Sequence, residues 1–309
     1  MTARTGSTAL GPGGPNAIAV TLGLLGDEWN LWIQRHAVDG CRRYGDWMGR
    51  GPISNTVLTG RLGRLTEAGL FDRVRYSDRP ARHEYVLTRR GRDLWPILLA
   101  MWAWEKDRDP TAALPEMRHG RCGELFSPVT ACADCDRPVT RAAVTAALGP
   151  SGDWTRSVPA SVGRRRSTGA RRPSPYLDRT MELLGDRWSA ALLGALMMGG
   201  SRFTELADRT GAPPAVLADR LRRFEDAGVV TAVENPERQD RVGYVLTARA
   251  EAFFPVITLM IAWGQRWFRA PEGPAISLTH ACGAPLRPRL RCDRCGEELR
   301  ASEVTVEDG

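Results

Sequence analysis

Six of the seven cysteines fall into two groups of equal spacing, C-x9-C-x2-C, and a histidine lies just ahead of each group. Three thiolates and one imidazole complete a tetrahedral ligand set for structural zinc and leave no position for a catalytic water. The predicted ligands are His119, Cys122, Cys132 and Cys135 in the first group, and His280, Cys282, Cys292 and Cys295 in the second. We therefore expect two structural zinc sites, one within each group.

Two other interpretations of these cysteines stay open: reduced thiols in a small ribbon fold, and a redox switch. The histidine is the least certain ligand, because the spacing is H-x2-C in one copy and H-x-C in the other. The seventh cysteine, Cys41, has no partner nearby in the sequence. We expect it to be a small buried apolar residue.

Chemistry of other kinds finds little support. The chain carries no nucleophile motif, no P-loop and no dinucleotide fingerprint. Only four histidines are present, and two of them are predicted metal ligands. We therefore predict that the protein is not an enzyme.

The charge favours a polyanionic partner. The formal net charge is +7, and Lys106 is the only lysine, so almost every positive charge is a guanidinium, which suits phosphate and base edges. A GC-rich genome would also produce this arginine content, so the support for nucleic acid is modest. No apolar run reaches the ~20 residues of a membrane span, and residues 1–14 lack the apolar segment of a secretory signal. We expect a cytoplasmic, nucleoid-associated protein.

The elements that position these groups occur twice, 159 residues apart. "TGRLGRLTEAGLF" at 59–71 is matched by "ADRLRRFEDAGVV" at 218–230, and "LLGDEW" at 24–29 by "LLGDRW" at 183–188. "YVLT" also recurs at the same offset. A repeat of this size predicts two domains in tandem.

Each copy has the same predicted order of elements. A helix with an apolar face over 17–38 is followed by a short helix, and then by a third helix that ends at a glycine, Gly69 in the first copy. Two β-rich runs around a polar loop predict a hairpin. A final amphipathic helix follows, and we expect Pro96 and Pro255 to kink it.

Three helices with a hairpin after the third is the order of a winged helix-turn-helix. The stretches "LDRTMELLGDRWSAALLGAL", "RFTELADRTGAPPAVLADRLRRFEDAGVV" and "YVLTARAEAFFPVITLMIAWG" resemble the HxlR-type bacterial transcriptional regulators, and the first copy resembles them again. The resemblance covers about 17–106 and 176–268. It implies winged domains that pair through their terminal helices and bind a two-fold operator, here fused on one chain.

The expected fold class is α+β, with two winged helix-turn-helix domains in tandem, each followed by a small Cys/His ribbon-like module. The expected boundaries are a disordered lead at 1–14, winged domain 1 at 15–108, Cys/His module 1 at 109–145, an Arg/Ser/Pro linker at 146–173, winged domain 2 at 174–269 and Cys/His module 2 at 270–309.

The third helix and the hairpin hold the predicted DNA contacts. Short polar side chains at a helix N-terminus suit base edges, and arginines suit phosphates. In the first copy we expect base contacts from Ser54, Asn55, Thr56 and Thr59, and phosphate contacts from Arg61, Arg64, Arg79 and Arg82. In the second copy the candidates are Arg220, Arg222, Arg223, Arg238 and Arg241.

The second copy lacks the polar leading residues, because Ala215 and Ala218 replace Thr56 and Thr59, and Asp219 replaces a glycine. This departure predicts unequal halves, of which the first reads more of the sequence.

The predicted function is a sequence-specific DNA-binding regulator, a repressor of promoters. The alternative is a zinc-stabilised protein–protein adaptor in which one or both winged domains do not read DNA. The predicted partners are double-stranded DNA and a small-molecule effector. The terminal helices are expected to form either an intrachain pseudo-dimer or a homodimer.

Overall fold

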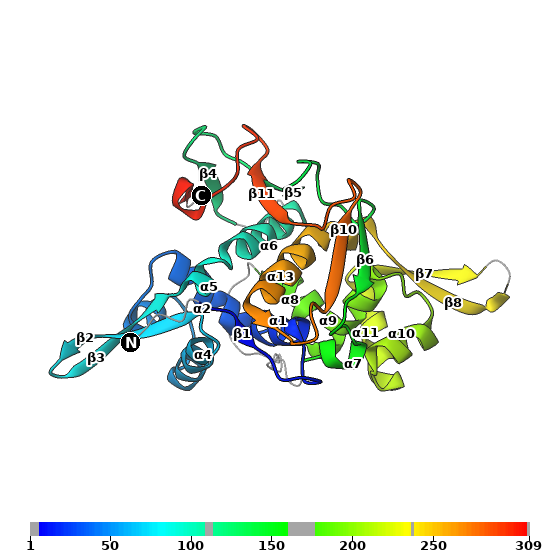
Figure 1. Ribbon diagram of the computed structural model, residues 1–309, viewed down its shortest axis with the longest axis horizontal. Helices are drawn as coiled ribbons and strands as arrows, with labels where there is room; N and C mark the ends of the chain where they lie inside the picture. Colours follow the sequence, from blue (N-terminus) through cyan, green and yellow to red (C-terminus); the bar gives the residue numbers. More distant parts are fainter. Residues whose placement is uncertain (1–5, 109–113, 160–176, 236–237, 308–309) are drawn as a thin grey trace.

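The computed structural model describes residues 6–108, 114–159, 177–235 and 238–307. Two helical bodies lie side by side, each with a β-hairpin that extends to the outside, and a strand-rich unit covers them on one side (Figure 1). The fold is α+β, as predicted. No helix among the described residues is long and apolar enough to cross a bilayer.

We call residues 17–108 the first head. Its elements are α1 (Ala17–Leu25), α2 (Glu28–Val38), α3 (Tyr44–Met48), α4 (Asn55–Glu67), β2 (Phe71–Asp78), β3 (Ala81–Leu87), α5 (Arg89–Arg92) and α6 (Trp95–Arg108).

The second head, residues 177–267, repeats this order. Its elements are α8 (Asp178–Leu184), α9 (Arg187–Met197), α10 (Phe203–Thr210), α11 (Pro214–Asp226), β7 (Val230–Asn235), β8 (Arg238–Leu246), α12 (Ala248–Glu251) and α13 (Phe254–Trp267). Each head is therefore a winged helix-turn-helix whose wing is the antiparallel hairpin β2–β3 or β7–β8.

The expected helix over 17–38 is two helices. The helical conformation is interrupted at Gly26 and Asp27, and the Asp27 side chain caps α2 by accepting from the backbone N–H of Asn30. The second head breaks in the same place, with Asp186 as the cap of α9. The apolar spacing continues through the break because both helices pack on one core, so periodicity alone did not reveal the break.

The expected kinks at Pro96 and Pro255 are also absent from α6 and α13. Each proline lies in the first turn of its helix, where the missing N–H has no intrahelical partner to lose. The prediction for the third helix is confirmed: Leu58, Leu62 and Leu65 of α4 are buried, and Gly69 follows the helix with a φ of +75°.

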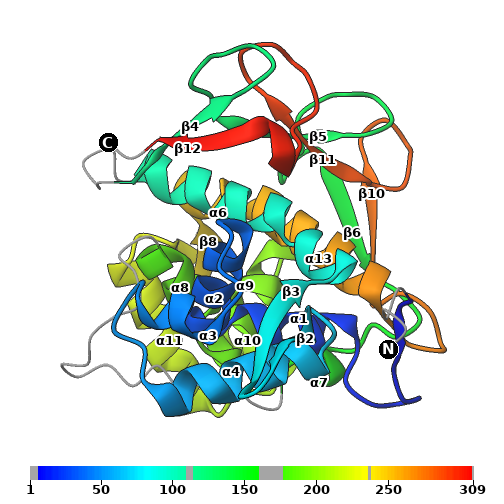
Figure 2. The same cartoon turned by 90° about the vertical axis from the view of Figure 1, so that its left-hand side faces the viewer.

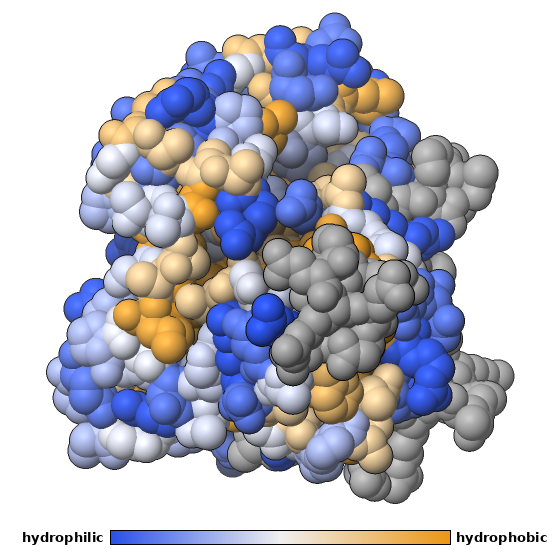
Figure 3. Space-filling model, turned by 90° about the vertical axis from the view of Figure 1, so that its right-hand side faces the viewer, coloured by the Kyte–Doolittle hydropathy of each residue, from blue (hydrophilic) through white to orange (hydrophobic). Residues whose placement is uncertain are grey.

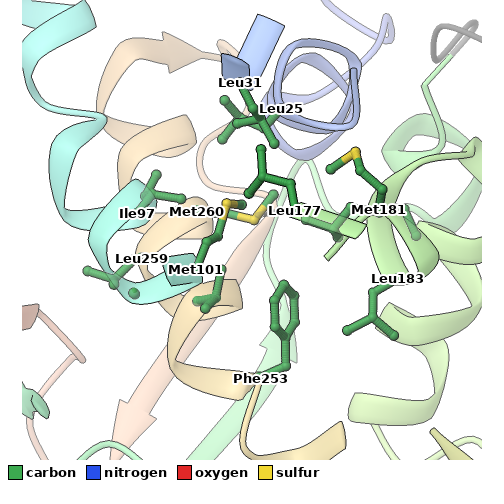
Figure 4. Packing of buried hydrophobic residues seen from close by; sticks show 14 of the residues in the cluster. Leu25, Leu31, Ile97, Met101, Leu177, Met181, Leu183, Phe253, Leu259 and Met260 are labelled. Atoms are coloured by element: carbon green, nitrogen blue, oxygen red, sulfur yellow. The ribbon is translucent and has the colours of Figure 1, made fainter. Parts of the chain in front are cut away.

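The two heads share one hydrophobic core. The terminal helices α6 and α13 contact each other, and α1 of the first head packs on α13 of the second. Figure 4 shows Ile97 and Met101 of α6 facing Met260 of α13, with side chains of α1, α2 and α8 around them. Trp104 Nε1 donates to the Arg249 carbonyl (3.3 Å), and Trp263 Nε1 donates to the Arg90 carbonyl (3.1 Å).

These two hydrogen bonds are copies of each other, because both partners differ by 159 positions. The heads are therefore related by an approximate two-fold axis that passes between α6 and α13. This is the expected intrachain pseudo-dimer, formed through the terminal helices.

The Cys/His segments form a single unit. Its strands are β4 (Glu116–His119), β5 (Pro128–Cys132), β6 (Val144–Leu148), β10 (Ile276–His280), β11 (Pro288–Cys292) and β12 (Val304–Glu307), with a 3-10 turn at Ala301–Glu303. The strand pairs are β4–β12, β5–β11 and β6–β10, all antiparallel. Each Cys/His segment follows its winged domain, and each pair joins a strand of the first segment to a strand of the second.

Two further boundaries differ from expectation. The predicted linker from residue 146 contains most of β6 and also α7 (Trp154–Ser157), which packs on α1 and α10. In the predicted disordered lead, β1 (Thr8–Ala9) pairs in parallel with β9 (Phe268–Arg269) of the second half. Both segments are short and polar, and tertiary partners order them. The remainder of the predicted linker, 160–173, lies outside the described residues.

Candidate nucleic-acid interface and metal clusters

Helix α4 presents a polar face at its N-terminus. Ser54 is the N-cap and accepts from the backbone N–H of Val57 (3.3 Å), which leaves Asn55, Thr56 and Thr59 exposed along the first turns. The predicted base-reading residues therefore lie together on one accessible surface. In Figure 1 this end of α4 and helix α11 lie on the side of the molecule away from the Cys/His unit.

A tyrosine that the sequence analysis did not single out organises this face. The Tyr44 hydroxyl, from the start of α3, donates to Asn55 Oδ1 (3.0 Å) and lies 3.2 Å from Thr59 Oγ1. These contacts set the orientation of both side chains before any ligand binds. The sequence signal that could have identified this contact is the tyrosine at the N-terminus of the short helix before α4.

Two glycines continue the exposed face of α4. A Cβ built at Gly60 or Gly63 would meet no heavy atom within 4 Å, so this side of the helix is open and smooth. A partner backbone can approach such a surface closely.

Three of the predicted phosphate-binding arginines have other partners. Arg61 forms a two-point ion pair with Asp27 (Nη2 to Oδ2 2.7 Å, Nε to Oδ1 3.1 Å), and Arg64 donates to the Gly23 carbonyl (3.0 Å). In the second head Arg220 pairs with Asp186 (3.0 Å). These arginines attach α4 and α11 to the bodies of the heads: Arg61 and Arg220 pair with the carboxylate at a preceding helix cap, and Arg64 binds a backbone carbonyl. These contacts give the three arginines a positioning role, and phosphate contact by them stays a prediction.

The wing of the first head carries the exposed arginines. Arg79 and Arg82 lie at the tip of the β2–β3 hairpin, as expected. Arg73 and Arg75 of β2 are exposed as well; the sequence predictions missed them because they placed the phosphate contacts in the loop alone. Arg75 also forms an ion pair with Asp78 (3.0 Å).

The second head offers a different surface. Arg222 and Arg223 are exposed on α11, and Arg223 pairs with Asp219 (3.0 Å). Its wing exposes Val233 and Val242 at positions along the hairpin. The backbones of Arg238 and Arg241 belong to β8, and their side chains lie outside the described residues.

On the other side of the molecule, the eight predicted metal ligands come together in two clusters. The first cluster is His119, Cys122, Cys292 and Cys295, and the second is Cys132, Cys135, His280 and Cys282. The residues that could hold a metal are the eight named from the sequence, but they are grouped differently. Each cluster takes a histidine and a cysteine from one segment and the C-x2-C pair from the other, because the strands of the two segments pair with each other.

The spacing of the ligand atoms fits a tetrahedral zinc ion. Bonds of about 2.3 Å to sulfur and about 2.0 Å to nitrogen place two sulfurs about 3.8 Å apart and a nitrogen and a sulfur about 3.5 Å apart. His119 Nδ1 lies 3.5 Å from Cys122 Sγ and 3.4 Å from Cys295 Sγ, and Cys122 Sγ lies 3.9 Å from Cys292 Sγ. This last separation is far longer than a disulfide bond of about 2.05 Å.

The second cluster has the same dimensions. His280 Nδ1 lies 3.3 Å from both Cys135 Sγ and Cys282 Sγ. A backbone N–H donated by Arg137 is the main cause that lowers the pKa of Cys135, to about 6, and such donors favour the thiolate that binds metal. Both histidine rings are buried, and their Nε2 atoms have no hydrogen-bond partner among the described residues.

The lone Cys41 is buried, as predicted. It lies in the core of the first head, apart from the metal clusters.

Two cavities occupy equivalent places in the two halves. The first, of about 560 Å³, lies between α2, α6 and β12, and its walls include Arg35, Arg50 and Trp95. The second, of about 80 Å³, has Gly194 and Phe254 where the first has Arg35 and Trp95, and its walls are almost entirely apolar. On the face in Figure 3, hydrophobic residues likewise gather in patches among hydrophilic ones.

Comparison with known proteins finds relatives for both halves. The family described as HxlR-like helix-turn-helix matches residues 24–112 and again residues 183–272. An uncharacterized HTH-type transcriptional regulator of Mycobacterium tuberculosis is 39% identical over 132 residues, which are 42% of this chain and 84% of that protein. The HTH-type transcriptional regulator YvaP of Bacillus subtilis is 31% identical over 94 residues, which are 30% of this chain and 87% of that protein.

Among solved structures, the reduced form of the transcriptional regulator YodB of Bacillus subtilis is 29% identical, with a TM-score of 0.28; the match covers 30% of this chain and 93% of that one.

Proposed function

The chain belongs to the HxlR-like helix-turn-helix family and is a transcriptional regulator of that type, and from this premise we propose that it is a repressor that binds a specific operator sequence. The proposal rests on one observation above all. The exposed, pre-oriented Asn55 and Thr59 at the start of α4 adjoin a wing rich in exposed arginines. Asparagine reads adenine edges in the major groove, and wing arginines neutralise the flanking phosphates.

Both heads would engage one duplex. Helices α4 and α11 lie on the same side of the molecule, and the wings extend to opposite ends (Figures 1 and 2). We expect half-sites about one helical turn, ~34 Å, apart. Binding of this kind covers a promoter and excludes polymerase, which is the basis of the proposed repression. It would take place in the cytoplasm, at the nucleoid.

Selection of bound sequences from random duplex DNA tests the proposal. We expect one enriched site with two half-sites, of which the half read by the first head is better defined. Affinity for that site should fall steeply with salt, since each neutralised phosphate contributes about −0.9 to the logarithmic slope. No enrichment, together with a salt-insensitive protein partner, would support the adaptor instead. Repression is tested separately, as loss of transcript from a promoter that carries the selected site.

We propose that zinc is the metal of both clusters. Mixed Cys/His ligands, a tetrahedral spacing and full protein coordination suit structural zinc better than magnesium or calcium, which take oxygen ligands. Elemental analysis of the purified chain should find about two zinc ions per molecule. One ion or none would contradict this.

We propose that the effector is an aromatic carboxylate and that it binds in the larger of the two cavities. The cavity of about 560 Å³ falls in the range of ligand sites and joins aromatic walls to the guanidinium groups of Arg35 and Arg50, with one carboxylate, Asp39, also in its lining. Tryptophan fluorescence during a titration with benzoate tests this. Arg35→Gly copies the second half and should abolish the binding, whereas equal affinity in this variant would contradict the assignment.

A further inference from the structure

The two metal clusters lie where the two halves of the chain meet, at the crossing of α6 and α13. Strand β5 contacts α6, and β11 contacts α13. Figure 2 shows the Cys/His unit above these helices, on the opposite side from α4 and α11. A link between the two Cys/His segments therefore adds to the shared core of the heads in holding the terminal helices in their crossing.

The axis between the heads continues through this unit. Thr130 of β5 faces Leu290 of β11, and the two positions are equivalent in the Cys/His repeat. On either side of this pair, His119 faces Val304 and His280 faces Val144. Each segment thus places its histidine-bearing strand against the last strand of the other.

The strands alone provide a weak connection. The three pairs are two-stranded and only four or five residues long, and short two-stranded ribbons are marginal in water without further support. Ion pairs between the segments, such as Arg118 with Glu307 (2.5 Å) and Arg287 with Asp134 (2.7 Å), are largely solvent-exposed and contribute little.

We propose that each metal ion is a cross-link between the two repeats, and that the pair of ions fixes the position of one head relative to the other. One ion would join ligands 170 residues apart, Cys122 and Cys292, and the other would join ligands 145 residues apart, Cys135 and His280. A link over such a long loop removes much of the freedom of the unlinked chain. The second half of the proposal rests on the proposed DNA binding; the first half does not.

Double cysteine variants of the full chain distinguish crossed clusters from separate ones. Cys122→Ser with Cys292→Ser removes two ligands of one crossed cluster, and we expect one metal ion per chain to remain. Cys122→Ser with Cys132→Ser, the matched control, damages both crossed clusters, and we expect both ions to be lost. Clusters confined to one segment each would give the opposite result.

The second cluster supplies an independent pair, Cys135→Ser with Cys282→Ser, which should also retain one ion. Loss of both ions in the two same-cluster pairs would overturn the inference, because the crossed clusters must load separately. Cadmium-113 NMR of the cadmium-loaded wild-type chain needs no variant. Couplings from one cadmium to Cys122 and Cys292 are expected, and couplings from one cadmium to Cys122 and Cys132 would overturn the crossed assignment.

The effect on the heads is measured with operators of altered half-site spacing. The metal-loaded chain should prefer one spacing by about tenfold or more, and the one-metal variant Cys122→Ser/Cys292→Ser should lose most of this preference. An unchanged preference in that variant would overturn the role in head position. If the metal-loaded chain selects no sequence at all, the proposed function fails while the metal counts still decide the crossing.

Discussion

The two heads share a fold and differ at the surface that would meet DNA. In the first head, the Tyr44 hydroxyl holds Asn55 and Thr59 at the start of α4. At the equivalent positions the second head has Phe203, Pro214 and Ala218, so the whole polar network is missing and not only one member of it. The polar network of the first head therefore has no counterpart at the equivalent positions of the second head.

The wings can be compared only over their described side chains. The first wing exposes Arg73, Arg82 and also Val74, and the described side chains of the second wing include the exposed Val233 and Val242. The side chains of Arg238 and Arg241 lie outside the described residues. Helix α11 also carries Asp219 where α4 has Gly60, and a carboxylate there repels phosphate. The comparison supports a first head that reads bases and a second head that contributes fewer contacts.

The largest expected difference between the heads concerns how strongly α4 and α11 are attached to the bodies of their heads. Arg61→Ala leaves the carboxylate of Asp27 unpaired, and this residue is only 3% exposed, so we expect a loss of about 3 kcal/mol in the free energy of unfolding. Arg220→Ala exposes Asp186, whose side chain is already 33% exposed, and should cost about 1 kcal/mol or less. Urea denaturation measures both, and equal losses would show that the two attachments are equivalent.

The next effect is on operator affinity. Asn55→Ala with Thr59→Ala removes the polar face of α4, and we expect a loss of about 2 kcal/mol in binding, roughly thirtyfold. The selectivity between operator and scrambled DNA should fall with it. Ala218→Thr in the second head is the matched substitution, and gel-shift titration should find its affinity little changed. A greater effect of the substitution in the second head would mean that the second head, and not the first, reads the operator.

A third difference lies inside the shared core. Glu105 of α6 is buried, and its Oε1 accepts from the Thr180 backbone N–H and hydroxyl (2.7 Å each). At the equivalent place α13 has Gly264, where a Cβ would collide with Thr21. Burial raises the pKa of Glu105 above its usual value near 4.5.

Because the folded state binds this proton more tightly than the unfolded state, stability falls as the pH rises from about 4.5 through the raised pKa. Glu105→Gln keeps the acceptor oxygen and removes the charge. We expect its melting temperature to exceed the wild-type value by about 2–4 °C at pH 7.5, with a smaller gap at pH 5. A gap that does not change with pH would contradict the pKa shift.

The smallest expected effect comes from removing the Tyr44 hydroxyl alone. Tyr44→Phe gives the first head the residue of the second, and we expect about a fivefold weaker operator affinity, the value of one hydrogen bond near 1 kcal/mol. Phe203→Tyr should change nothing, because its neighbours Pro214 and Ala218 offer no side-chain acceptor. Fluorescence anisotropy of labelled operator resolves a change of this size.

Much of this arrangement could be predicted from the sequence. The doubled elements, the buried stripe of α4, the turn at Gly69 and the eight residues that form the Cys/His clusters are local patterns, and each depends on a few neighbouring residues. The exposed polar face at the start of α4 is also a local pattern, since short polar residues precede an apolar stripe; its role in reading DNA stays a prediction.

The rest depends on contacts between distant segments. Cys122 can share a metal with Cys132 or with Cys292 at the same local spacing, and only the pairing of β4 with β12 decides. Arg61 looks like any exposed arginine until the fold brings it to the helix cap at Asp27. The break at Gly26 was visible as a Gly-Asp pair, but the apolar period continued across it.

The reciprocal hydrogen bonds from Trp104 and Trp263 join two heads that are arranged like the subunits of a dimer but lie on one chain, so that each head has its own stretch of sequence. In a homodimer, a substitution in the reading helix appears in both subunits, so the recognised sequence must remain an inverted repeat. Here each reading helix can diverge on its own while the joint between them is preserved. Such a chain can become the dedicated regulator of an asymmetric promoter, which no pair of identical subunits would match equally well.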